Sequence, residues 1–387
     1  MAFLLAPYAC LPQHSRGRFL GEEDCFMRDP IQRDRDRIIH SSAFRRLKHK
    51  AQVFIATEGE YYRTRLTHSM EVAQIARGIS RAFEFNEDLA EAISLAHDLG
   101  HAPFGHAGED ALQEAMAEEG GFNHNDQTFR LLTHLERKYP NFDGLNLTWE
   151  TLEGIVKHNG PIKGGISSHP PLRSIYAFCK KFDLELESYP SAEAQVAALS
   201  DDIAYNSHDI DDGFRAGLFT LDDVCQVPMV GKICNEIMTT YPNLSEDDLI
   251  REAIRRLING FVYDLRQETQ RRLADLKPQS VEDVRNLKVP LVALSDGHMK
   301  NLKEIHAFLT EHMYYHAAVT TMKAAGRAIV RDLYAIEKHR HYSPEGSVKA
   351  EDIADKVAIL TDHEALIAHE KLTGRKYVSP LTPSKQS

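Results

Sequence analysis

The sequence has few cysteines, and their arrangement excludes two common ways of stabilising a chain. Five cysteines are scattered through 387 residues, and no two of them form a CxxC pair. Disulfide frameworks and zinc ribbons both need an ordered pattern of closely spaced or paired cysteines. The odd number and the wide spacing are typical of a protein from the reducing cytosol.

The sequence also lacks long apolar runs. No stretch approaches the roughly 18 apolar residues of a membrane span, and the apolar N-terminus MAFLLAPYAC is short and lacks a basic leader. We therefore expect a soluble, cytoplasmic protein with no membrane partner. The formal net charge of -11 argues against a nucleic-acid coat. Single-stranded nucleic acid is accordingly not predicted as a partner.

Strand-type alternation is nearly absent, whereas apolar residues at helical spacing recur along most of the chain. Asp29-Pro30 is a typical helix start, and Ser245 precedes apolar positions that keep helical spacing for about six turns. The sequence therefore predicts an all-α protein. Besides these two helices, we expect helices over residues 67–85, 87–99, 106–118, 125–138, 148–158, 191–209, 298–314, 318–340, 347–360 and 362–372.

The pattern also predicts how the chain is divided. We expect an N-terminal arm, a helical core, a C-terminal helical region packed on the core, and a frayed tail. Residues 57–64 are predicted as a loop or short hairpin, and the glycine- and proline-rich residues 160–171 as a lid or a subunit contact. The four parts span residues 1–28, 29–220, 221–375 and 376–387, in that order.

Residues 95–109, LAHDLGHAPFGHAGE, concentrate side chains that bind metals. His97 and Asp98 end an apolar helical run, Gly100 offers the left-handed conformation that stops a helix, and Pro103 prevents its continuation. A neutral imidazole beside a carboxylate suits Mn, Fe, Co, Mg or Zn. A buried structural pair is the alternative, but a charge at this helix end has no evident packing reason.

Further ligands must come from other segments. His68 follows Thr67, a candidate N-cap of an amphipathic helix, and Asp201 and Asp202 lie in a later helix. Taken alone, His68 would be a hydrogen-bonded histidine at a helix start. A histidine, a His-Asp pair and a distant aspartate, in this order, form the ligand pattern of the HD phosphohydrolase superfamily, which the chain resembles.

Five blocks narrow the resemblance to the deoxyguanosinetriphosphate triphosphohydrolase family, in its dGTPase-like bacterial branch. They stand in the family's order between about residues 30 and 215, whereas beyond residue 221 only LKEIHAFLTEHMYYH shows a general similarity. The resemblance implies an HD-domain helical core with additional C-terminal helices. The blocks are QRDRDRIIHSSAFRRLKHKAQVF, RTRLTHSMEVAQIARGISR, AHDLGHAPFGHAGED, FNHNDQTFR and SDDIAYNSHDIDD.

The resemblance also implies a divalent metal, which could be Mn, Mg, Fe, Co or Ni. The family places its last metal carboxylate, a tyrosine and a second carboxylate four residues apart, as in Asp201, Tyr205 and Asp209. Residues at this spacing share one helix face, whereas Asp202 points about 100° away and is the second choice. The implied metal ligands are His68, His97, Asp98 and Asp201.

Other residues take roles by the same resemblance. His106 and Glu109 would form a catalytic dyad in which the glutamate fixes the imidazole tautomer. Their spacing alone fits a pair that caps a helix equally well. His124 and His101 would contact the phosphates. Arg65, otherwise a solvated arginine at a helix start, would do the same.

The sugar contacts implied by the resemblance lie on two segments. Gln52 and Asp209 would meet the 3′-hydroxyl, and Tyr205 would pack beside C2′ and crowd a ribose 2′-hydroxyl. A tyrosine on an apolar helix face is otherwise an ordinary core residue. The resemblance thus gives a physical reason for a preference for deoxyribose.

The implied activity is metal-dependent hydrolysis of deoxynucleoside triphosphates to deoxynucleoside and inorganic triphosphate, by attack of water at the α-phosphorus. Members of the family commonly assemble as hexamers, so a homo-oligomer is implied. One alternative is an HD-type nucleotidase or phosphodiesterase for mono- or cyclic nucleotides. Another is a catalytically silent regulator that binds nucleic acid.

Overall fold

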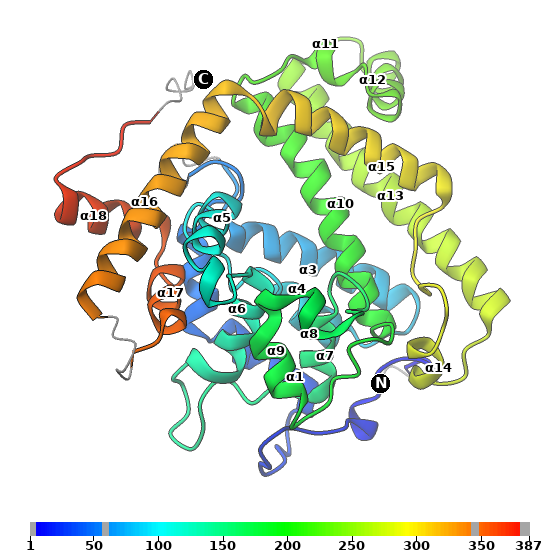
Figure 1. The fold of residues 1–387 in the computed structure, drawn as a ribbon. Helices are drawn as coiled ribbons and strands as arrows, with labels where there is room; N and C mark the ends of the chain where they lie inside the picture. Colours follow the sequence, from blue (N-terminus) through cyan, green and yellow to red (C-terminus); the bar gives the residue numbers. More distant parts are fainter. Residues whose placement is uncertain (1–4, 56–61, 342–347, 380–387) are drawn as a thin grey trace.

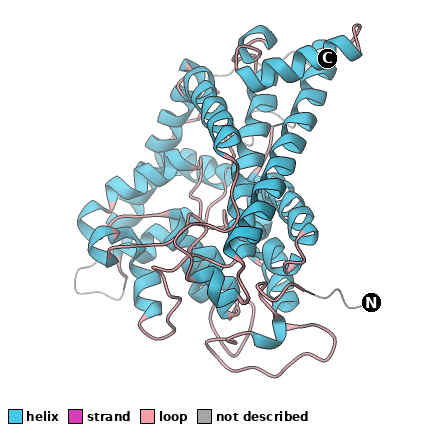
Figure 2. Cartoon of the chain, turned by 90° about the vertical axis from the view of Figure 1, so that its right-hand side faces the viewer, coloured by secondary structure: helices cyan, strands magenta, loops and turns pink. Residues whose placement is uncertain are grey.

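The structure is a computed structural model that describes residues 5–55, 62–341 and 348–379. In these residues the fold is built from helices, and extended segments meet only at isolated bridges (Figures 1 and 2). The predicted all-α class is confirmed. Most of the predicted loop at residues 57–64, and the end of the predicted tail, lie outside the described residues.

The described residues form eighteen α-helices. Those of the first half are α1 (Pro30–Ile39), α2 (Ser42–Arg46), α3 (Arg65–Ala82), α4 (Glu87–Ala96), α5 (His106–Ala115), α6 (His124–Arg130), α7 (Trp149–Val156), α8 (Gly165–Ser168), α9 (Arg173–Cys179) and α10 (Ala192–Arg215). Those of the second half are α11 (Leu221–Val224), α12 (Pro228–Thr240), α13 (Glu246–Leu276), α14 (Val281–Arg285), α15 (Asp296–Leu309), α16 (Ala317–His341), α17 (Ala350–Ala358) and α18 (Asp362–Thr373). One-turn π-helices, Leu131–Leu135 and Thr310–Tyr314, extend α6 and α15.

Capping residues account for several helix starts. Asp29 accepts hydrogen bonds from the main chain of α1, and Ser245 caps the 31-residue helix α13, as predicted. The predicted N-cap Thr67 is wrong, because Thr64 caps α3 and Thr67 is its partner in the capping box. Helix α3 therefore begins at Arg65.

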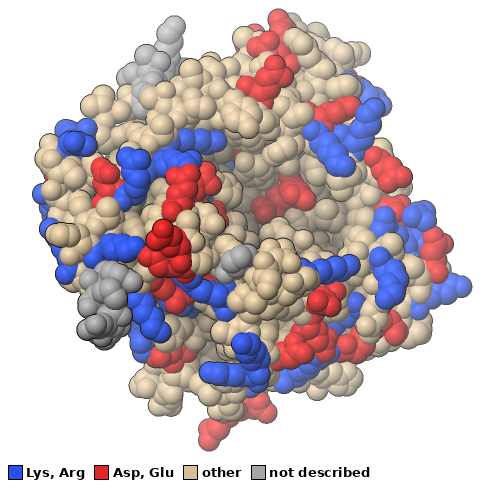
Figure 3. Space-filling view, viewed as in Figure 1, with Lys and Arg blue, Asp and Glu red and all other residues tan. Residues whose placement is uncertain are grey.

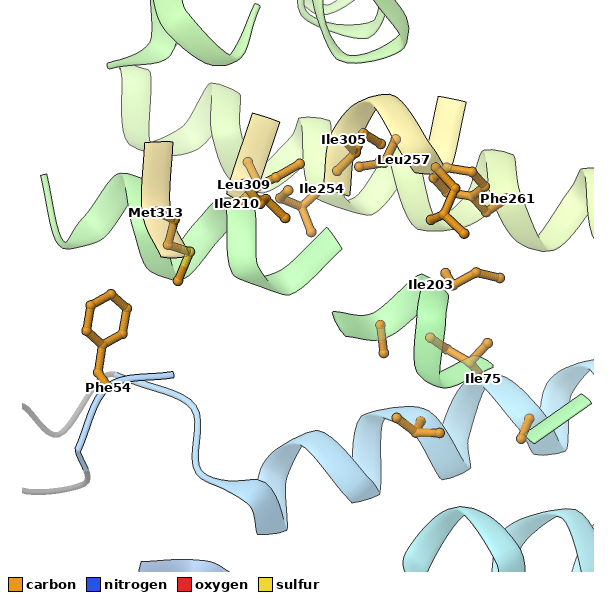
Figure 4. Close-up of a cluster of buried hydrophobic side chains, with 14 of the residues drawn as sticks. Phe54, Ile75, Ile203, Ile210, Ile254, Leu257, Phe261, Ile305, Leu309 and Met313 are labelled. Atoms are coloured by element: carbon orange, nitrogen blue, oxygen red, sulfur yellow. The ribbon is translucent and has the colours of Figure 1, made fainter. Parts of the chain in front are cut away.

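Helix α10 is the central element of the fold. It packs against α3 and α4 on one side and against α13 and α15 on the other (Figure 1). Figure 4 shows Ile203 and Ile210 of α10 among apolar side chains of α3, α13 and α15. Each such buried side chain contributes about 1.5–3 kcal/mol to folding. This packing makes α10 a rigid support for the polar side chains on its remaining face.

The C-terminal helices also hold two loops of the core in place. Asp362, fully buried at the start of α18, accepts the main-chain N–H of Ala51 at 2.9 Å and of Phe104 at 2.8 Å. Buried Lys50 donates to the carbonyl of His101 and to a carbonyl at the end of α17. Burial lowers the pKa of Lys50 to about 7. The junction of α17 and α18 thus fixes the segments around residues 51 and 104.

We expect Asp362→Ala to destabilise the protein by about 2–4 kcal/mol, because two buried N–H groups lose their acceptor. A urea titration followed by helical circular dichroism measures the loss. Asp247→Ala, on the exposed side of α13, is the matched control and is expected to change stability by less than about 0.5 kcal/mol. Equal midpoints for the two variants would contradict this role of Asp362.

Candidate active site

The turn that follows α4 carries the His-Asp pair and differs from the prediction in one detail. The residues with left-handed backbone conformation in this turn are Phe104 and Gly105, with φ of 63° and 59°, so the predicted left-handed Gly100 is wrong. Gly100 is instead required because α6 lies against it. A Cβ there would come within 2.2 Å of the main chain of His124 and Thr128.

His97 is oriented by its own helix. Its Nδ1 donates to the carbonyl of Ser94 at 2.7 Å, so Nε2 carries the lone pair. This Nε2 is buried without a hydrogen-bond partner among the described residues. Burial lowers the pKa of His97, which keeps the ring neutral. A fixed neutral imidazole with an unpartnered buried nitrogen fits the requirements of a metal ligand.

Helix α10 brings Asp201 to the same place. Its Oδ1 lies 2.8 Å from His68 Nε2 and 3.6 Å from His97 Nε2, and its Oδ2 lies 3.2 Å from His158 Nε2. The side chain of Asp202 is exposed and forms no ion pair with a histidine in the described part of the chain. Burial opposes ionisation of Asp201, but the histidines outweigh it and lower its pKa well below the usual value.

Among the described residues, two overlapping groups could hold a metal ion in this region. The donor atoms of His68, His97 and Asp98 lie within 4.8 Å of one another, and so do those of His97, His158 and Asp201. His97 belongs to both groups, so the other three predicted ligands, His68, Asp98 and Asp201, lie around it. The role of all four as ligands stays a prediction. The sequence analysis missed His158, because a histidine between a helix end and an Asn-Gly turn carries no distinctive signal.

Arg65 does not point away into solvent. Its guanidinium donates to Asp98 Oδ2 at 2.7 Å, and both side chains are buried. The other oxygen of Asp98 lies 3.1 Å from His101 Nε2. Burial raises the pKa of Asp98, but Arg65 and the adjacent histidines outweigh this effect and hold it well below the usual value. The predicted phosphate contacts Arg65 and His101 thus meet at the carboxylate of the predicted ligand Asp98.

Glu109 connects the histidines of a second cluster. It accepts hydrogen bonds from His124 Nδ1 at 2.8 Å and from His106 Nδ1 at 3.1 Å. Because a carboxylate only accepts, both rings hold their proton on Nδ1 and leave Nε2 free for chemistry. The ring of His101 stacks on that of His124 with centroids 4.1 Å apart. The expected dyad is therefore part of a larger cluster in which one glutamate orients two imidazoles.

A third polar group lies two turns along α10 from Asp201. Asp209 is buried and accepts a hydrogen bond from Tyr314 Oη at 2.7 Å, and the rings of Tyr205 and Tyr314 stack with centroids 6.0 Å apart. The sequence analysis did not single out Tyr314. The side-chain oxygen of Gln52 is buried without a partner among the described residues. Its predicted pairing with Asp209 at a sugar stays a prediction.

Helix α10, which carries Asp201, Tyr205 and Asp209, lies beside a recess on the surface of the molecule. Figure 3 shows the hollow between the region of α5 and α16 and that of α10 and α15, with acidic side chains at its floor near α10. The groups described above combine imidazoles, carboxylates and tyrosines. Such an arrangement can bind a cation, orient a proton donor or acceptor, and receive a polar ligand.

Asp209 provides a test of the electrostatics at this end of the recess. Burial raises its pKa from 3.8 to about 7, although the Tyr314 hydrogen bond opposes the shift. Because the folded state holds this proton more tightly, the wild-type protein loses stability as the pH rises from about 4 to about 7. We expect Asp209→Asn to raise the unfolding temperature, with a gain that grows from pH 5.5 to pH 7 and then levels off.

Differential scanning calorimetry at pH 5.5, 7.0 and 8.5 measures this gain. Asp222→Asn, an exposed aspartate of α11, is the control and is expected to show no such pH dependence. A variant at position 209 that is less stable than wild type at pH 8.5 would contradict the buried-carboxyl interpretation.

Comparisons with known proteins agree with this geometry. Residues 65–206 match the HD domain, and residues 292–371 match the phosphohydrolase-associated domain. The chain is therefore an HD-domain phosphohydrolase. No described helix is long and apolar enough to cross a membrane.

Relatives of similar length define the family. A deoxyguanosinetriphosphate triphosphohydrolase-like protein of Brucella suis is 49% identical over 384 residues, which are 96% of each chain. Proteins of the same name from Parvibaculum lavamentivorans and a Bradyrhizobium species are each 49% identical, over 95% and 96% of this chain and 96% and 97% of their own. The chain belongs to the deoxyguanosinetriphosphate triphosphohydrolase-like family, as the sequence blocks predicted.

Proposed function

We propose that the protein hydrolyses deoxynucleoside triphosphates to deoxynucleoside and inorganic triphosphate. The observation that carries the proposal is the arrangement of three neighbouring groups, of which the first two are linked by the contact between Asp98 and His101 at 3.1 Å. A His-Asp cluster that suits a cation adjoins a histidine cluster organised by Glu109, and a tyrosine-carboxyl pair lies two helical turns away. The names of the relatives support a nucleotide substrate.

The cation would be held by the predicted ligands, and the unpartnered Nε2 of His97 supports this fit. When bound, a divalent cation neutralises phosphate charge and lowers the pKa of a water molecule. The donor set combines imidazole and carboxylate, which suits Mn, Fe, Co or Ni, and Mg when carboxylates dominate. The predicted ligands are His68, His97, Asp98 and Asp201.

The protein's own residues would do the remaining work. Glu109 holds the Nδ1 protons of His106 and His124, so their Nε2 atoms face outward from the carboxylate. His106, whose side chain is 67% exposed, can reach a ligand in the recess and protonate the departing 5′-oxygen or accept a proton from water. His101 and His124 would bind the phosphates with Arg65.

The tyrosine-carboxyl pair would select the sugar. Asp209 offers a polar group to a 3′-hydroxyl, and its neighbour Tyr205 is held against Tyr314 by ring stacking. A fixed ring beside C2′ leaves no room for a ribose 2′-hydroxyl, because packed interiors do not yield easily. We therefore expect deoxyribonucleotides to be preferred over ribonucleotides.

The test is to incubate the purified protein with each of the four dNTPs and with GTP, in the presence of Mn²⁺ or Mg²⁺. Chromatography then separates deoxynucleoside, mono-, di- and triphosphate products. Free deoxynucleoside and tripolyphosphate in equal amounts would support the proposal. Orthophosphate release, or turnover of mono- or cyclic nucleotides alone, would replace it with the nucleotidase or phosphodiesterase alternative.

One set of results would favour the silent regulator instead. It is stoichiometric metal binding without turnover of any nucleotide, together with salt-dependent binding of oligonucleotides. A homo-oligomer stays an expectation, and multi-angle light scattering measures it directly.

A further inference from the structure

His158 occupies a defined position beside the candidate metal site. It lies two residues after the end of α7, and its side chain is buried. Its Nε2 is 3.2 Å from Asp201 Oδ2, and its ring stacks on that of His97 with centroids 5.0 Å apart and 23° between the planes. No role for this histidine follows from the predicted ligand set.

The two oxygens of Asp201 have different surroundings. Oδ1 faces the rings of two predicted ligands, with His68 Nε2 at 2.8 Å and His97 Nε2 at 3.6 Å. Oδ2, the other oxygen of the carboxylate, contacts His158 and neither His68 nor His97. Because a carboxylate accepts hydrogen bonds, the contact at 3.2 Å requires His158 to carry its proton on Nε2. The hydrogen bond sets the rotation of the carboxylate about its Cβ–Cγ bond.

The main chain that carries His158 is itself firmly held. Lys157, fully buried, pairs with Glu153 one turn earlier at 3.0 Å and donates to Ser188 Oγ at 2.9 Å. Gly154 allows close packing of α7 on α4, since a Cβ there would lie 2.3 Å from the Ile93 side chain. The imidazole therefore approaches Asp201 from a rigid support, so a hydrogen bond between them costs little conformational entropy.

One interpretation of His158 is that it binds a second cation, and the donor atoms around it argue against this. The described donor group around it contains His97 and Asp201 besides His158. The single free nitrogen of His97 can serve only one ion. A second ion would thus have two protein ligands, whereas metal sites usually have at least three.

We propose that His158 is a positioning residue of the metal site. It holds Asp201 so that Oδ1 faces the cation and Oδ2 is occupied by the imidazole N–H. Histidine and carboxylate ligands commonly depend on such outer hydrogen bonds, and their loss weakens metal affinity by about 10- to 100-fold. The inference rests on the proposed role of Asp201 as a ligand, and it does not depend on which nucleotide is hydrolysed.

The experiment compares two substitutions that keep the site filled. His158→Phe keeps a ring against His97 but cannot donate, whereas His158→Gln retains an N–H donor that can reach Asp201. Mn²⁺ titrations followed by electron paramagnetic resonance give affinity and stoichiometry without any nucleotide. We expect the Phe variant to bind Mn²⁺ about 10- to 100-fold more weakly at unchanged stoichiometry. The Gln variant should recover most of the affinity.

His134→Ala, at an exposed histidine of the π-helix that follows α6, is the matched control and should bind Mn²⁺ as wild type does. Wild-type affinity in the Phe variant would overturn the positioning role. Loss of one equivalent of Mn²⁺ would make His158 a ligand and overturn it as well. A wild-type protein that binds no Mn²⁺ would remove the basis of the inference, whereas binding without triphosphate release would refute only the proposed reaction.

Discussion

Asp201→Ala is expected to abolish metal binding and to lower turnover by at least about 10³-fold, whereas Asp202→Ala should leave both within a few-fold of wild type. Asp201 meets His68, His97 and His158, and no other described carboxylate meets all three rings. A bound cation is worth several kcal/mol of transition-state stabilisation, and about 4 kcal/mol corresponds to 10³ in rate. Asp202 lies on the exposed neighbouring face of α10.

Inductively coupled plasma mass spectrometry on the dialysed variants gives the metal content, and product chromatography gives the rate. The two aspartates are adjacent on one helix, so each variant controls for the effect of the other on α10. Circular dichroism should show the same helix content in both. Equal loss of metal from the two variants, or retention of metal by Asp201→Ala, would refute the assignment.

Helix geometry is one feature that could be predicted from the sequence, whereas the role of Asp201 as a ligand stays a prediction. Asp201, Tyr205 and Asp209 are four residues apart and therefore share one helix face. In the structure Asp201 meets His68, and Tyr205 and Asp209 both meet Tyr314. Helix caps were predictable for a similar reason, because Asp29 and Ser245 act on residues next to them in the chain. Local rules of this kind need no knowledge of the tertiary fold.

One error is local, since Thr64 and not Thr67 caps α3, whereas the other errors concern contacts between distant segments. Gly100 was expected to end a helix by its own conformation, but it is needed because the main chain of α6 approaches it. His158 and Tyr314 reach Asp201 and Asp209 from 43 and 105 residues away in the chain. Neither has a local pattern that distinguishes it from an ordinary histidine or tyrosine. The periodicity of the sequence therefore indicated which residues share a helix face. Only the packing of the helices revealed which residues contact Asp201 and Asp209.

The same limit applies to Asp362. Its position at the first residue of α18 is typical of an aspartate near a helix start, where a surface role is the usual expectation. In the structure it is buried and accepts N–H groups from segments 311 and 258 residues away. The phosphohydrolase-associated region thus supports the candidate site, since it fixes loops that carry predicted site residues.

Glu109→Gln should lower turnover by about 10²- to 10⁴-fold while metal content stays at the wild-type level. The glutamate accepts Nδ1–H from His106 and His124, and it also accepts the main-chain N–H of His124 at 2.9 Å. Glutamine has only one accepting oxygen, so it cannot hold both rings in the same tautomer. Proton transfer by a positioned imidazole contributes about 10²- to 10⁴-fold, and this contribution should be lost.

Asp110→Asn is the matched control, because Asp110 is the next residue of α5 and its exposed side chain faces Arg327 instead. The comparison separates loss of the histidine partner from a general loss of negative charge on this helix. Steady-state kinetics at saturating Mn²⁺ should show the decrease in kcat for the glutamine variant alone. If that variant loses its metal, Glu109 acts as a ligand, and if it keeps wild-type kcat, the two histidines do not need their shared carboxylate.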